Sequence, residues 1–133
     1  MNTISIEHLQ GKLVEGVFEV ESTIQNKYKN YHVYLKLENI GYVFIETLDP
    51  DEINEFRVLN TIPKANRPCV GNAKIIGSII LDVIKSDHIS SIGFLCNNDY
   101  LIINEIGEFR NSAEILEMPK FVDKMEFTSL IKK

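Results

Sequence analysis

The chain has 133 residues, of which 44% are hydrophobic and 25% charged, values typical of one globular domain. Its formal net charge of −5 disfavours general binding to nucleic-acid phosphates and suits a basic protein partner. No apolar run approaches the roughly 20 residues that span a bilayer, and no signal-peptide pattern is visible. We therefore expect a cytoplasmic protein that binds neither membranes nor nucleic acid directly.

The first part of the chain predicts a short helix and three strands. The helix is expected over 3–10, closed by Gly11 in a left-handed conformation. A wide polar loop is expected over 24–30, and a turn that ends at Gly41. Alternation of apolar and polar residues predicts strands at three places: 13–22, 31–37 and 42–47.

The same alternation predicts which side chains of these strands point inward. In the first strand, Val14, Phe18 and Val20 are expected on one face and the glutamates Glu15, Glu19 and Glu21 on the other. In the second strand, the inward set is Tyr31, Val33, Leu35 and Leu37, and the outward set is His32, Tyr34 and Lys36.

Residues 49–52, with the sequence Asp-Pro-Asp-Glu, have the pattern of a helix start. Asp49 can cap the helix, Pro50 suits its first position and Glu52 sits at the capping-box position. Ile53 and Phe56 then supply an apolar face at i and i+3, so a helix is expected to run to about residue 60.

The second part of the chain repeats the strand pattern of the first. Segment 60–73 contains two prolines and Gly71 and is interpreted as a connection. A tight turn is expected at 97–99, a short turn at 113–118 and a C-terminal helix from Pro119. Strands are expected at three places: 75–84, 91–96 and 100–105.

The two parts show a faint internal duplication. The segment Gly-Lys-Leu-Val-Glu-Gly-Val-Phe from Gly11 aligns with Gly-Ser-Ile-Ile-Leu-Asp-Val-Ile from Gly77, 66 residues later. The pseudo-repeats cover about 11–59 and 75–118 within a single domain, 1–133. The predicted fold class is therefore α+β: about six mostly antiparallel strands, arranged as two three-stranded meanders that share one core, with short helices on one face.

No catalytic or metal-binding motif is present, so we expect a non-enzymatic protein with no metal and no cofactor. The histidines His8, His32 and His88 are scattered, and the two cysteines are interpreted as free thiols. A nucleophilic pair of Cys96 with His32 is disfavoured, because alternation places the thiol on a buried face and the imidazole on an exposed one.

The sign of the charge changes abruptly along the middle of the chain. Six acidic residues and no basic residue lie between Leu37 and Phe56, whereas the segment from Arg57 to Lys74, both included, has four basic residues and no acidic one. Two interpretations stay open, a solvated helix face and a negative surface that docks onto a basic protein. Tyrosines around the first hairpin support an interface. The candidate partner-binding residues are Glu46, Asp49, Asp51, Glu52, Glu55, Tyr28, Tyr31 and Tyr34.

With its small size, its acidity, its lack of catalytic motifs and the acidic block from Glu46 to Glu55, the chain resembles the small immunity proteins of bacterial toxin systems, including contact-dependent growth inhibition. The resemblance implies tight stoichiometric binding that blocks the active site of a toxin domain. It carries over no catalytic residue. The chain has no Leu-Pro pair and no Trp, so it does not match the common immunity superfamily that has a Leu-Pro-x-x-Tyr segment.

Two other functional classes remain alternatives at this point. The first is an acidic secretion chaperone, a class similar in size that forms homodimers, although the expected first helix is very short for that class. The second is a small enzyme without a recognisable motif. The sequence leaves the choice between monomer and homodimer open.

Overall fold

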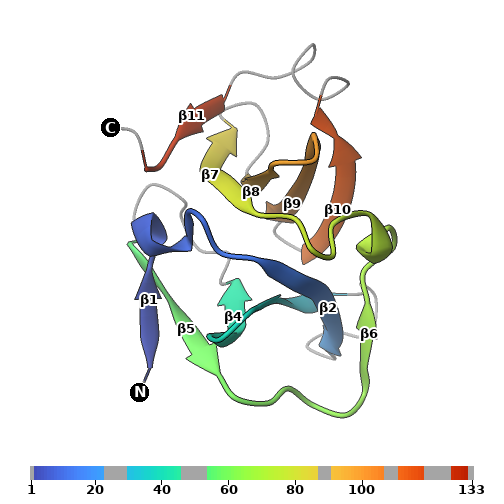
Figure 1. Ribbon diagram of the computed structural model, residues 1–133. Helices are drawn as coiled ribbons and strands as arrows, with labels where there is room; N and C mark the ends of the chain where they lie inside the picture. The colour runs from blue at the N-terminus through green and yellow to red at the C-terminus, as the bar shows by residue number, and fades with distance from the viewer. Residues whose placement is uncertain are drawn as a thin grey trace.

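The computed structural model describes residues 2–22, 30–45, 54–86, 91–106, 111–118 and 127–131. Within these residues the fold consists of two antiparallel sheets, one of six strands and one of five (Figure 1). The predicted dominance of antiparallel sheet is confirmed. The described part of the chain contains eleven strands rather than about six.

The six-stranded sheet occupies the lower half of Figure 1 and has the order β1-β5-β4-β3-β2-β6. Strands β2 to β5 are neighbours in chain order, while β1 is added beside β5 and β6 beside β2. The strands are β1 (Thr3–Ser5), β2 (Val14–Ser22), β3 (Asn30–Leu37), β4 (Gly41–Ile45), β5 (Glu55–Leu59) and β6 (Asn66–Pro68).

The five-stranded sheet lies above it and has the order β10-β9-β8-β7-β11. Strands β7 to β10 are again neighbours in chain order, and β11 returns to pair with β7. The strands are β7 (Ile80–Ser86), β8 (Ser91–Cys96), β9 (Tyr100–Ile106), β10 (Asn111–Glu117) and β11 (Phe127–Ser129).

The helices predicted from the sequence are largely replaced by strands. Residues 3–10 form β1 and a single 3-10 turn, η1 (Ile6–Leu9), because residues 3–5 pair with β5 instead of coiling. The helix predicted from Asp49 is wrong over Glu55–Leu59, which is strand β5; residues 46–53 lie outside the described residues. The connection contains a second 3-10 helix, η2 (Asn72–Lys74). An α+β class is therefore not supported.

In the C-terminal part, strands again stand where other structure was predicted. The turn predicted over 113–118 belongs to strand β10, which pairs with β9. The helix predicted from Pro119 falls mostly on 119–126, outside the described residues, and residues 127–129 form β11. Among the described residues, no helix has the length and apolar character needed to cross a membrane.

A β-bulge reverses the predicted faces of β2. Its register against β3 shifts between Val14 and Gly16, so one extra residue is inserted. Val17 and Glu19 therefore point into the interior with Val14, while Phe18 lies on the opposite face. Simple alternation cannot detect the inserted residue, and it assigned Glu19 to the solvent face.

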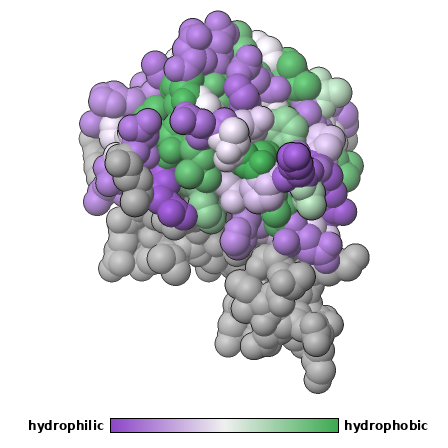
Figure 2. Space-filling view, turned by 90° about the horizontal axis from the view of Figure 1, so that it is seen from below, coloured by the Kyte–Doolittle hydropathy of each residue, from purple (hydrophilic) through white to green (hydrophobic). Residues whose placement is uncertain are grey.

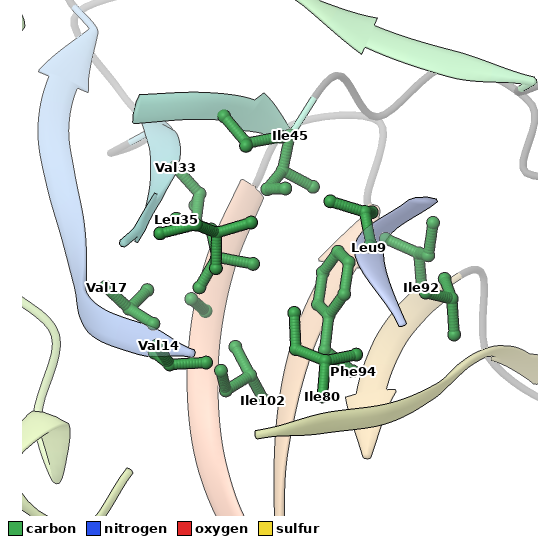
Figure 3. Close-up of a cluster of buried hydrophobic side chains, with 14 of the residues drawn as sticks. Leu9, Val14, Val17, Val33, Leu35, Ile45, Ile80, Ile92, Phe94 and Ile102 are labelled. Carbon is green, nitrogen blue, oxygen red and sulfur yellow. The ribbon is translucent and has the colours of Figure 1, made fainter. Parts of the chain in front are cut away.

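One hydrophobic core lies between the two sheets. Side chains of the six-stranded sheet, such as Leu35, point toward those of the five-stranded sheet, such as Phe94 (Figure 3). The inward orientation predicted for Val33, Leu35 and Leu37 is confirmed, since each is at most 2% exposed. Phe56 and Phe94 approach with ring centroids 6.3 Å apart, which joins β5 to β8 across the core.

The sheets also meet through the main chain. Leu13 and Ile79 form an isolated antiparallel bridge. The glycines two residues before them both have positive φ, +85° and +84°. Strand β7 also has a register shift, between Ile80 and Asp82, 66 residues after the shift in β2. Two hydrogen bonds of 2.8 Å flank the bridge: Gly11 N–H donates to the carbonyl of Ile80, and Gly77 N–H donates to the carbonyl of Val14. The two donors are 66 residues apart, and so are the two acceptors.

Candidate functional site

The acidic block predicted as a binding site is described only at its end. Glu55 is the first residue of β5, and its carboxylate accepts a hydrogen bond of 3.3 Å from the Thr3 hydroxyl of β1. It is exposed and lies on a strand, so the predicted helical grouping of Asp49, Glu52 and Glu55 does not form through Glu55. The remaining members lie outside the described residues: Glu46, Asp49, Asp51 and Glu52.

The predicted tyrosine cluster is not an open surface in the part that is described. Tyr34 is only 4% exposed, and its ring packs against Phe44 at 5.1 Å. Burial raises the pKa of Tyr34, an effect that nearby Arg57 opposes. Tyr31, on the other face of β3, lies under the guanidinium of Arg67 at 4.5 Å. Tyr28 lies outside the described residues.

The outer face of the six-stranded sheet carries a layer of aromatic side chains. Phe18 meets Tyr42 edge to face at 5.9 Å, and His32 packs on Phe44 at 5.4 Å. The Lys36 ammonium covers the Tyr42 ring at 5.4 Å. Figure 2 views the molecule from the side on which this sheet lies in Figure 1, and apolar and polar residues interleave on the coloured surface. The layer is thus largely self-covered rather than one continuous apolar patch.

A cleft of about 480 Å³ opens where the edges of the two sheets approach each other. Strand β1 is the last strand at one edge of the six-stranded sheet, and β11 is the last strand at one edge of the other. The lining comes from β1, η1, the start of β5, β7, β11 and the residues after it: Ser5, Ile6, Glu7, Asn54, Glu55, Lys85, Thr128, Ser129, Leu130 and Ile131.

The cleft presents carboxylates on one wall, and hydroxyl groups together with Lys85 on the other. Glu7 of η1 and Glu55 of β5 are both exposed and line it. On the opposite wall, the Ser129 hydroxyl donates to the Asp82 carboxylate at 2.7 Å and accepts from the Ile131 N–H at 3.2 Å. Glu55 is one of the candidate residues predicted from the sequence and Glu7 is not, because the pairing of β1 with β5 joins residues about fifty positions apart.

We call each place where an edge of one sheet approaches an edge of the other a joint, so the cleft lies in the joint of β1 with β11. A buried carboxylate, Glu19, occupies the second joint, where β2 and β6 approach β10. Glu19 is 6% exposed, 3.9 Å from Arg67, and accepts a hydrogen bond from the backbone of Ala113. The Cys69 thiol donates to the carbonyl of Ala113 at 3.2 Å. Desolvation raises the pKa of Glu19, while Arg67 and the Ala113 hydrogen bond oppose the shift. These contacts cap the edge of β10.

The two joints have matching strand registers. Glu19 faces Arg67 across β2 and β6, and Lys85, 66 residues after Glu19, faces Thr128 across β7 and β11. The Glu19 joint is filled by its own side chains, whereas the Lys85 joint contains the cleft. The cleft is therefore the open member of a related pair of joints.

The cysteines do not form an accessible nucleophile. Burial, together with the nearby carboxylates of Glu19 and Glu114, raises the pKa of Cys69 to about 12, so this thiol stays protonated at neutral pH. Burial also raises the pKa of Cys96, which is 1% exposed in the core. His32 lies on the outer face against Phe44, so it does not face Cys96. In the described parts of the chain, no group of three His, Cys, Asp or Glu residues is arranged to hold a metal ion.

Comparison of the chain with protein-family models, with curated proteins and with solved structures finds no match in any of the three.

Proposed function

We propose that this chain is a cytoplasmic, non-enzymatic immunity protein that neutralises a basic toxin domain by tight stoichiometric binding. The observation that carries the proposal is the cleft between β1 and β11, where Glu7 joins the predicted site residue Glu55. A basic side chain of the partner would enter this cleft between the two carboxylates.

The charges on the chain support a basic partner. The net charge of −5 attracts a basic protein over long range, which raises the rate of association. Glu7 and Glu55 are exposed, so they lose little solvation until the partner covers them. Close charge pairs at such interfaces couple by about 1.5–7 kcal/mol in measured double-mutant cycles. Among the described residues, two carboxylates against the single cation Lys85 leave the lining of the cleft acidic on balance, so substitution of both carboxylates should weaken the binding of a basic partner.

Rescue of toxin-expressing cells tests the proposal. Wild-type protein is co-expressed with a basic toxin domain encoded beside its gene, and survival is compared with that of the double variant Glu7→Lys, Glu55→Lys. Glu38→Lys is the control, because Glu38 is an exposed residue of the β3–β4 turn and does not line the cleft. We expect survival with wild type and the control, and loss of survival with the double variant. Equal rescue by all three would contradict a role for the cleft, and homodimerisation with binding to an unfolded effector segment would indicate a secretion chaperone instead.

We further propose that the scaffold of the cleft arose from two copies of one meander, about 11–59 and 75–118. The reciprocal hydrogen bonds of Gly11 and Gly77 and the matching β-bulges support this proposal. On this view each copy supplies one joint between the sheets. One joint is closed by Glu19, and the other is left open for a partner.

A further inference from the structure

We propose that the partner's segment binds the cleft as an extended strand that pairs with the outer edge of β1, an edge that no other strand of the described residues occupies. The inference rests on the proposed function, since it specifies how the basic partner is held there. It adds main-chain recognition to the carboxylate contacts.

The hydrogen-bonding pattern of β1 provides the first argument. The Val58 N–H donates to the carbonyl of Asn2 at 2.9 Å, and the Ile6 N–H donates to that of Asn54 at 3.0 Å. Residues 2, 4 and 6 therefore bond to β5, and the main-chain groups of Thr3 and Ser5 point to the other side of the strand. Such an edge is a template for an added strand.

Ser5 is the residue of this edge that lines the cleft. Ser5 is the N-cap residue of η1, the position whose carbonyl accepts the first hydrogen bond of a helix. Its N–H is directed away from β5. Among the described residues, no hydrogen bond of the Ser5 N–H appears beyond the strand ladder. The comparable edge group in the closed joint, the backbone of Ala113, is bonded by the side chains of Glu19 and Cys69. The open joint lacks an equivalent cap within the described residues, so an incoming strand can supply it.

The charged side chains of the described residues that line the cleft are Glu7, Glu55 and Lys85, so two of the three are acidic and the balance favours a basic occupant. Side chains of an added strand alternate between its two faces, so basic residues at every second position would all face the same side. Glu7 and Glu55 are the carboxylates that such a row would meet. A second copy of this chain is disfavoured as the occupant, because two copies of net charge −5 repel each other. The occupant is therefore an extended basic segment of another protein.

Ser5→Pro is a sharp test, because it removes one N–H and fits the local backbone. The φ of Ser5 is −73°, close to the value that proline requires, and its N–H is not used within the sheet. Ser5→Ala is the matched control, since it also removes the hydroxyl that contacts His8 Nδ1 at 3.0 Å but keeps the N–H. The probe is a fluorescein-labelled peptide of alternating lysine and threonine, measured by fluorescence anisotropy, with an alternating glutamate and threonine peptide as the opposite-charge probe.

We expect wild type and Ser5→Ala to bind the lysine peptide equally, and Ser5→Pro to bind it about five- to tenfold more weakly, the loss of one hydrogen bond. The glutamate peptide should not bind. Equal binding by Ser5→Pro and Ser5→Ala would overturn strand addition while leaving the rescue experiment on Glu7 and Glu55 as a separate test. No binding of the lysine peptide to wild type, or a wild-type dimer that Ser5→Pro dissociates, would also overturn it.

Amide exchange of the wild-type protein gives a second readout that does not depend on how the proline variant folds. Addition of the lysine peptide should slow the exchange of the Thr3 and Ser5 amides, whose N–H groups point to the outer edge of β1. The Ile4 amide already bonds to β5 and should change little. Unchanged exchange at Thr3 and Ser5 in the presence of saturating peptide would contradict the proposal.

Discussion

Substitution of alanine for Gly11 and for Gly77 should destabilise the protein equally. The two residues have almost the same φ, +85° and +84°, and an added Cβ would meet no atom within 4 Å at either place. The cost is therefore backbone strain alone, about 1–2 kcal/mol for a residue with a side chain in the left-handed region. Urea unfolding followed by circular dichroism measures this change in the free energy of unfolding directly.

Gly41→Ala is the contrasting variant. Its φ is +122°, and an added Cβ would lie 2.8 Å from the carbonyl oxygen of Leu59. Its cost should exceed that of either other glycine, because a steric clash adds to the strain. Unequal costs for Gly11→Ala and Gly77→Ala, by more than about 1 kcal/mol, would refute the equivalence of the two main-chain contacts between the sheets.

Two further predictions concern the interior. Because desolvation raises the pKa of Glu19 in the folded state above its ordinary 4.5, its contribution to stability is present below that pH and is lost as the pH rises through the folded pKa. Glu19→Gln should therefore gain stability relative to wild type as the pH rises above 4.5, and parallel pH profiles of the two proteins would contradict the burial of a charged Glu19. Phe94→Ala should cost about 3–5 kcal/mol and preserve a single unfolding transition, because Phe94 is 1% exposed and contacts Phe56 of the other sheet. Two separate transitions in calorimetry would show that the sheets do not share one core.

Local patterns predicted the parts of the fold that depend on neighbouring residues. The alternation of Val33, Leu35 and Leu37 identified a strand with one buried face, and the turn at Gly41 has the positive φ expected there. The turn over 97–99 was predicted from its polar residues, and Asp99 has a positive φ of 67°. In each case the signal lies within one strand and the turn next to it.

The errors came from elements whose structure depends on a distant partner. Ile53 and Phe56 have helical spacing, yet Phe56 lies in a strand, because β5 pairs with both β1 and β4. Strands β6 and β11 have three residues each, too few to show a period. The bulge after Val14 changed the face of Glu19. Propensity is overridden in such places by tertiary pairing.

The candidate site was predictable only in part for the same reason. The density of acidic residues before Arg57 indicated Glu55. Glu7 has no local feature that marks it, since it enters the cleft only when β1 pairs with β5 and β11 closes the opposite wall. The outward N–H of Ser5 likewise follows from strand register and not from residue type.

Hydrogen–deuterium exchange of the protein mixed with the proposed toxin partner tests the central claim most directly, because it locates the bound surface without any substitution. We predict that binding slows amide exchange in β1, η1 and β11, the elements that line the cleft, and leaves the β3–β4 turn around Glu38 unchanged. Slowed exchange confined to other strands, with β1, η1 and β11 unaffected, would contradict the assignment of the cleft as the binding site.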